Sequence, residues 1–235
     1  MTPFQPRGLI SPQEWLDGLQ PRLPSFSPDT IKHEVLSVAR DFFQRSYAWQ
    51  DWTELKLKAN TVLYSPELTD YKAEICSILA GRHKDEYAWL RPAEPMYPIS
   101  DILKMQAGRP DFYNLTPERM FCIFPAPERD DEFVVRLYCA MKPIDLCMPD
   151  WIRSLHYEAI RDGVLANLYA IPGIIYKPDL ALMHLKKYSS AVDKATVDAR
   201  IAYAGIEETV PFNRGFARGY QRRSSSGSPL WGWNI

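Results

Sequence analysis

The residues whose chemistry could support catalysis are the four histidines and the cysteines near them. Cys147 precedes His156 by nine residues, and Asp145 is close to both in sequence. A cysteine nucleophile needs a base within hydrogen-bond reach, and closeness in sequence does not establish that geometry. We therefore expect His156 to be an ordinary polar contact on the flank of a helix. His33 and Glu34 begin like a zinc-protease motif, but that motif needs a second histidine four residues on, and this chain has none there.

The remaining candidates for a metal or cofactor site are a carboxylate run, a glycine turn and the cysteines. The run 128–132 (ERDDE) could hold a cation, although a solvated hairpin tip explains it better. The turn 108–113 (GRPDFY) lacks the Lys-Ser/Thr helix start of a phosphate loop. No two cysteines have Cys-x-x-Cys spacing, so we expect free thiols in a reducing cytoplasm at Cys76, Cys122, Cys139 and Cys147. The sequence therefore predicts no catalytic residue, no cofactor and no metal.

Charge is distributed unevenly along the chain. The formal net charge is −1, with 28 basic and 29 acidic residues. The segment from Phe212 to Ile235 contains four arginines and no acid, so the rest of the chain has 24 basic and 29 acidic residues, a net charge of −5. An acidic body with a basic C-terminal segment disfavours a general nucleic-acid-binding module.

The segment 212–235 is the best candidate for binding a partner. Its arginines are interleaved with aromatic residues, and two tryptophans lie within its last five residues. We expect it to dock as an extended peptide on an acidic protein groove, with the tryptophans as anchors. Nucleic-acid binding by charge and stacking and an unstructured tail remain alternatives. The candidate partner-binding residues are Arg214, Phe216, Arg218, Tyr220, Arg222, Arg223, Trp231 and Trp233.

Apolar residues at helical spacing predict three helices. The first, at about 28–47, begins after a capping Ser27 with proline in the first helical position. Two more are predicted at about 150–169 and 178–204, the last with the narrow apolar seam of a helix hairpin. Gly163 lies inside the second helix, where glycine costs about 1 kcal/mol relative to alanine. We expect close approach of the alanine-rich seam of the third helix to offset that cost, with a kink as the alternative.

Between the first two helices the pattern changes to period two. Alternation over 54–63 predicts a strand with one solvated face, and further strands are expected at 71–79, 87–90, 119–124 and 132–141. Short strands separated by proline and turn signals favour an antiparallel sandwich-like sheet. The predicted fold class is α+β: a three-helix bundle with a long C-terminal helix, an antiparallel β-sandwich-like insertion between helix 1 and helix 2, and an extended C-terminal arm.

The predicted domain organisation follows from these elements. Residues 1–26 are expected to form an N-terminal arm with a short helical turn near Pro12–Leu19. Residues 27–49 with 146–205 are expected to form a helical bundle, 50–145 a β domain, and 206–235 a C-terminal extension. The N-terminus has no apolar signal region, and no apolar stretch is long enough to span a bilayer. We expect a soluble protein made in a cytoplasm.

Three parts of the sequence carry a family resemblance: 28–49, the turn 108–113 with PAP at 125–127, and 142–173 followed by 176–195. They resemble the head-to-tail adaptor (connector) proteins of tailed bacteriophages. The second long helix is preceded in that family by an Asp before a Pro, and by a helix with an Ala-Ile-x-x-Gly step and a leucine-rich end. Lys177 departs from the family, in which a capping Asn, Asp or Ser is usual, and so does Phe43, where Cys is common. The resemblance covers about residues 26–205.

The resemblance implies a structural virion protein without enzymatic activity. It implies a homo-oligomeric ring, a dodecamer, that binds the portal protein on one side and the tail or nozzle protein on the other. DNA would pass through the lumen during ejection without specific binding, and no membrane is involved. The implied location is the virion neck or tail, after assembly in the host cytoplasm. The alternatives are another neck component, such as a tail-completion or stopper protein, and, from different classes, a small enzyme or a nucleic-acid-binding module.

Overall fold

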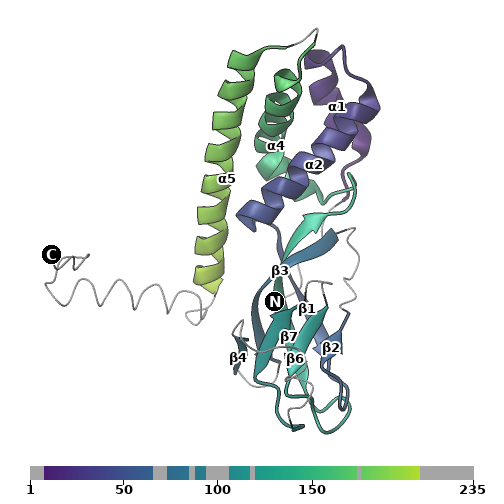
Figure 1. Ribbon diagram of the computed structural model, residues 1–235, viewed down its shortest axis with the longest axis vertical. Coiled ribbons are helices and arrows are strands. Elements are labelled where there is room, and N and C mark those ends of the chain that lie inside the picture. Colours follow the sequence, from purple (N-terminus) through teal and green to yellow (C-terminus); the bar gives the residue numbers. More distant parts are fainter. Residues whose placement is uncertain are drawn as a thin grey trace, which may run out of the picture. The chain divides into compact units, whose positions relative to one another are not determined.

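The structure is a computed structural model that describes residues 8–65, 73–84, 88–93, 106–116, 120–173 and 176–206. The chain forms two compact units, Met1–Ala199 and Arg200–Ile235. Every strand of the described residues lies in the first unit, and so do most of the helical residues (Figure 1).

Four α-helices occur among the described residues: α1 (Pro12–Leu19), α2 (Pro28–Ser46), α4 (Asp150–Ala170) and α5 (Pro178–Ile206). The start of α2 is capped, because the backbone N–H of Thr30 donates to Oγ of Ser27 over 3.1 Å. The end of α2 is marked by Tyr47, whose φ of 53° is left-handed and stops the helix. At the start of α1, the backbone N–H of Ser11 donates to Oε1 of Glu14 over 3.2 Å, which satisfies a terminal donor.

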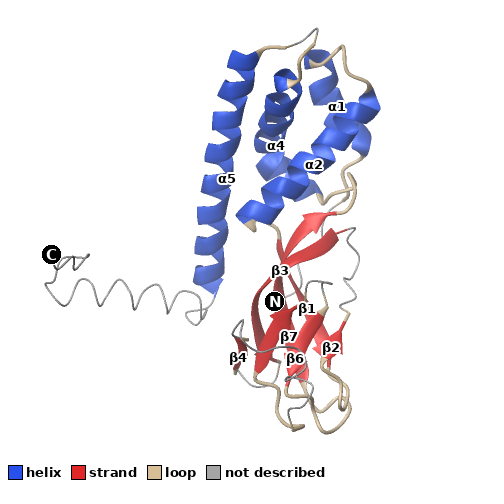
Figure 2. Ribbon diagram, viewed as in Figure 1, coloured by secondary structure: helices blue, strands red, loops and turns tan. Residues whose placement is uncertain are grey.

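Seven strands form one curled mixed sheet with the order β1–β7–β3–β4–β5–β6–β2 (Figure 2). All neighbouring pairs are antiparallel except β4 and β5, which run parallel. The long pair β3 and β7 lies between the edge strand β1 and the shorter strands β4, β5, β6 and β2. The strands are β1 (Gln50–Lys56), β2 (Leu63–Tyr64), β3 (Ala73–His83), β4 (Trp89–Pro92), β5 (Phe112–Leu115), β6 (Phe121–Phe124) and β7 (Val134–Pro143).

The predicted fold class is therefore wrong. Helices do occur close to all three predicted ranges, but they do not form a three-helix bundle beside an antiparallel sandwich. A fourth helix, α1, contributes Trp15, Leu16 and Leu19 to the core. The β part is a single curled sheet with a parallel pair. The short helical turn expected near Pro12–Leu19 is confirmed as α1, and burial of its three large apolar side chains stabilises a helix of only eight residues.

One strand prediction and one turn prediction also fail in the β part of the chain. The alternating segment 54–63 is divided between β1 and β2, which lie at opposite edges of the sheet. Between them the chain turns, with Asn60 at a left-handed φ of 54°. The expected turn 108–113 contains the start of β5, which pairs with β4 and β6. Short strands like these depend on long-range partners, which local sequence does not specify.

One hydrophobic cluster joins the helices to the sheet. It contains residues from all four helices together with the inward side of β7, represented by Val135, Leu137 and Met141. Gly163 of α4 lies at the closest approach within the helical part. A Cβ there would be 2.5 Å from Cγ1 of Val38 and 2.9 Å from Cδ2 of Tyr188. The expected close approach of the seam of α5 is confirmed at Tyr188, which belongs to that seam, and Val38 of α2 adds a second contact.

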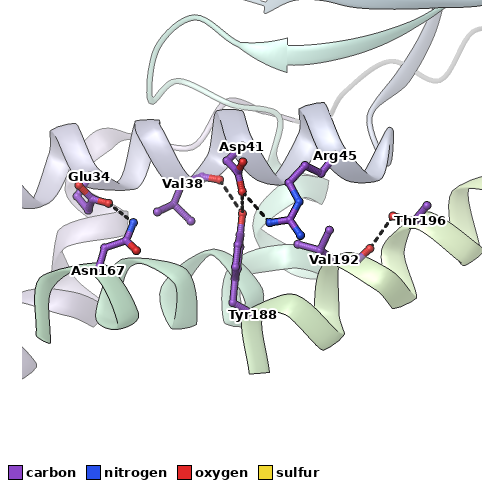
Figure 3. A network of polar contacts seen from close by, with 8 residues as sticks. All are labelled: Glu34, Val38, Asp41, Arg45, Asn167, Tyr188, Val192 and Thr196. Atoms are coloured by element: carbon purple, nitrogen blue, oxygen red, sulfur yellow. Dashed lines mark hydrogen bonds and ion pairs between the residues drawn. The ribbon is translucent and has the colours of Figure 1, made fainter. Parts of the chain in front are cut away.

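A polar network fixes α5 against α2 (Figure 3). Tyr188 of α5 points toward α2, and its hydroxyl donates to Oδ2 of Asp41 over 2.7 Å. Burial, together with the bond to Asp41, raises the pKa of Tyr188, so the hydroxyl stays a donor at neutral pH. Arg45 completes the group through an ion pair to the same carboxylate oxygen at 3.3 Å. Asn167 of α4 adds a separate bond to Glu34 at 2.6 Å.

Candidate interaction surfaces

The predicted cysteine–histidine arrangement is not formed. The backbone N–H of Cys147 donates to Oδ1 of Asp145 over 2.8 Å, and no hydrogen bond between Cys147 and His156 occurs in the described part of the chain. The prediction that His156 is a polar contact on a helix flank is wrong. Its ring lies among Phe42, Phe43 and Trp151, with centroid distances of 5.0, 5.7 and 6.2 Å. Burial lowers the pKa of His156 to about 4, partly opposed by the Asp198 carboxylate.

This environment predicts a pH-dependent stability. The unfolded chain takes up a proton at His156 near pH 6.5, whereas the folded chain does so only near pH 4. Stability from the neutral ring is therefore lost as pH falls from about 6.5 toward 4. Between pH 7 and pH 5 the loss should be about 1 kcal/mol after allowance for solvent screening. In urea denaturation, His156→Leu should flatten this pH dependence, and the exposed His33→Leu should leave it unchanged. Equal slopes for all three proteins would show that His156 does not titrate in this way.

The carboxylate run 128–132 lies in an exposed loop between β6 and β7. The two strands are not neighbours in the sheet, so the loop is not a hairpin tip, as the sequence had suggested. No group of three or more His, Cys, Asp or Glu side chains in the described ranges is arranged to hold a metal ion. The predicted partner-binding residues Arg214, Phe216, Arg218, Tyr220, Arg222, Arg223, Trp231 and Trp233 lie outside the described residues.

The connection between α4 and α5 leaves large apolar side chains exposed. On α5, Ala181, His184 and Tyr188 occupy the buried face, so their neighbours at other angles point away from the core. Leu182 is 57% exposed, the highest value in this set. We call the set the hairpin surface, and it consists of Ile171, Tyr176, Leu180, Leu182, Met183 and Leu185.

Two contacts hold the hairpin surface in place. The backbone N–H of Lys177 donates to the carbonyl of Tyr169 over 3.1 Å, which ties the connection to the end of α4. Nδ1 of His184 lies 3.0 Å from Oδ1 of Asp162, and both side chains are buried between α4 and α5. The hairpin surface is therefore presented by a supported end of the helix pair. Exposed large apolar side chains at a supported end of a helix pair make this surface a candidate for a protein contact.

The outer side of the sheet carries a different surface, which we call the arginine–aromatic face. The guanidinium carbon of Arg136 lies 4.4 Å from the ring centroid of Trp52. The guanidinium carbon of Arg82 lies 5.9 Å from the ring of Tyr138 and 6.0 Å from that of Trp89. The face consists of Trp52, Glu54, Arg82, Lys84, Trp89, Arg91, Arg136 and Tyr138.

Strand register brings these residues together. Arg136 lies opposite Glu54 on one side and opposite Arg82 on the other, and Arg82 in turn lies opposite Trp89. Directly opposed residues share one face of a sheet, and the alternate residue Leu137 is buried on the other side. The sequence did not predict this face. Alternation within a strand shows which residues share one side of that strand, but it does not show which strands are neighbours.

The arginine–aromatic face is positively charged. It holds four basic side chains and one carboxylate. That carboxylate, Glu54, accepts a hydrogen bond from Lys84 over 2.9 Å and from Arg136 over 2.6 Å, and these bonds lower its pKa. Trp, Tyr and Arg are the residues most often found at energetic hot spots of protein interfaces. Composition and charge together indicate a surface suited to an acidic protein partner.

Comparisons with known proteins assign no family. No protein-family model matches the chain, and no curated protein matches it. Among the described helices, none is both long and apolar enough to cross a membrane.

Proposed function

We propose that the chain is a structural virion protein, a head-to-tail adaptor whose copies form a ring joining the portal to the tail or nozzle around the DNA channel. The observation that carries the proposal is the hairpin surface, whose six large apolar side chains are each 37–57% exposed. A ring component needs such a contact area on every copy. The proposal that this ring joins a portal to a tail or nozzle rests on the resemblance of residues 26–205 to the adaptor family.

The proposal assigns different tasks to different parts of the chain. The hairpin surface supplies apolar contact area, which is the main source of association free energy between proteins. The segment 212–235, with four arginines and two tryptophans, is the portal-binding element. The body of the chain carries net negative charge, so DNA passing through the ring would be repelled rather than retained.

Imaging the assembly tests this function. The full-length chain should be studied by mass photometry and negative-stain electron microscopy, alone and mixed with the portal protein encoded by the same genome. We expect closed rings bound coaxially to the portal. A chain that stays monomeric and never binds the portal at micromolar concentration would contradict the proposal.

A matched pair of variants tests the role of the hairpin surface in the same experiment. Leu182→Ser with Leu185→Ser should reduce the ring population at least tenfold, because about 1.5–3 kcal/mol is lost for each buried leucine. Leu155→Ser removes a leucine of α4 that is 70% exposed outside the hairpin surface, and it should have little effect. Equal losses for both variants would indicate general destabilisation instead.

A further inference from the structure

The loop 128–132 has the charge opposite to that of the arginine–aromatic face. It contains four carboxylates and one arginine, and all five residues are exposed. We call it the acidic loop. Its backbone is anchored, because the N–H of Asp131 donates to the carbonyl of Leu57 over 2.8 Å and the N–H of Ala59 donates to Oδ1 of Asp130 over 2.7 Å. Glu128, Asp131 and Glu132 form no ion pair within the described ranges.

We infer that the acidic loop of one copy of the chain docks on the arginine–aromatic face of the next copy. The inference rests on the proposed function, because a ring supplies the neighbouring copy. Both surfaces are held in place before contact: the loop by its backbone bonds, and the arginines by the rings of Trp52, Tyr138 and Trp89. Pre-ordered side chains lose little conformational entropy on binding. Two different patches that pair head to tail generate a ring when the rotation closes.

Charge and composition favour a second copy over a nucleic acid. Glu54 lies within the face and bonds two of its four basic residues, so a phosphate group would meet a carboxylate beside them. Arg91 is exposed, and the side chain of Lys84 is 42% exposed. Both can bind carboxylates that are held at fixed positions, as those of the acidic loop are. Trp52, at 41% exposure, adds apolar contact area on the edge strand β1 of the face. An acidic protein loop therefore fits this face better than an extended phosphate backbone does.

Reciprocal charge reversal tests the inference on the full-length chain. The loop variant carries Glu128→Lys, Asp131→Lys and Glu132→Lys, and the face variant carries Lys84→Glu and Arg91→Glu. Assembly would be followed by sedimentation velocity and mass photometry, alone and with the portal protein. Each variant alone should raise the concentration for half-assembly at least tenfold at about 0.1 M salt, where screening is moderate. A control with Asp17→Lys, Asp29→Lys and Glu158→Lys makes the same charge change as the loop variant on exposed helical positions and should assemble like the unaltered chain.

Mixing the two variants gives the decisive measurement. In an equimolar mixture the reversed loop meets the reversed face, and the native loop meets the native face. The mixture should therefore form rings of alternating chains at a concentration at which each variant alone remains largely unassembled. Circular dichroism of each variant should match the unaltered chain, which separates lost docking from lost folding.

Three results would overturn the inference while leaving the proposed function intact. The first is normal ring formation by either variant. The second is a mixture that does not recover, or that recovers only a closed dimer. The third is binding of a labelled 20-nucleotide single strand that the face variant loses while its rings persist, which would assign the face to nucleic acid. If the unaltered chain itself forms no ring with or without the portal, the proposed function fails first.

Discussion

Replacing Glu74 with alanine is expected to lower the free energy of unfolding by about 3 kcal/mol. The carboxylate of Glu74 in β3 forms ion pairs with Arg40 of α2 at 2.5 Å and with Lys142 of β7 at 3.2 Å. The side chain of Lys142 is only 8% exposed, and its remaining bond in the described residues is to Oε1 of Gln44 at 3.1 Å. Without Glu74, a buried ammonium would lose its nearby carboxylate at the junction between helix and sheet.

Urea denaturation measures this effect, and two further variants identify its cause. Asp29→Ala removes an ion pair to Lys32 whose carboxylate is 92% exposed, so it should cost less than about 0.5 kcal/mol. Glu74→Ala combined with Lys142→Met should regain most of the lost stability, because the unpaired buried charge is then removed. A Glu74→Ala loss below about 1 kcal/mol would show that water reaches Lys142 and solvates it.

Deleting residues 212–235 is expected to abolish attachment to the portal while the first unit stays folded. The 24 removed residues can extend about 80 Å at roughly 3.3 Å per residue, which is far enough to lie along a partner subunit. Ordering such a segment costs conformational entropy, so binding needs a compensating gain. Trp231 and Trp233 in pockets, with arginine–carboxylate pairs along the segment, would supply that gain.

Co-sedimentation with portal rings measures attachment, and thermal unfolding followed by circular dichroism checks the fold. Trp231→Ala with Trp233→Ala should reproduce most of the loss, because anchor residues carry a large share of binding energy. Alanine at Ser224, Ser225 and Ser226 alters the same segment without removing an anchor or a charge, and attachment should persist. If the protein lacking residues 212–235 still attached to the portal, the body of the chain would make the contact. The proposed role of the segment would then be wrong.

The helical elements could be predicted from the sequence because their signals are local. The bounds of α2 follow from Ser27, a proline in the first helical position and apolar residues at helical spacing. The same periodicity locates α4 and α5 to within two residues. The close approach at Gly163 was also predictable, because a glycine inside a helix needs a compensating contact. The charge contrast between the segment 212–235 and the rest of the chain is likewise a property of sequence alone.

The sheet and its surfaces were decided by tertiary structure. Strand order places β1 beside β7 and separates it from β2, although β1 and β2 adjoin in sequence. The arginine–aromatic face exists only because that order puts Trp52 opposite Tyr138 and Arg136 opposite Arg82. The packing of α2 against α4 likewise surrounds His156 with aromatic rings. Pairing between distant strands and helices depends on which arrangement buries the apolar side chains of the whole chain. A local pattern of residues does not determine that arrangement.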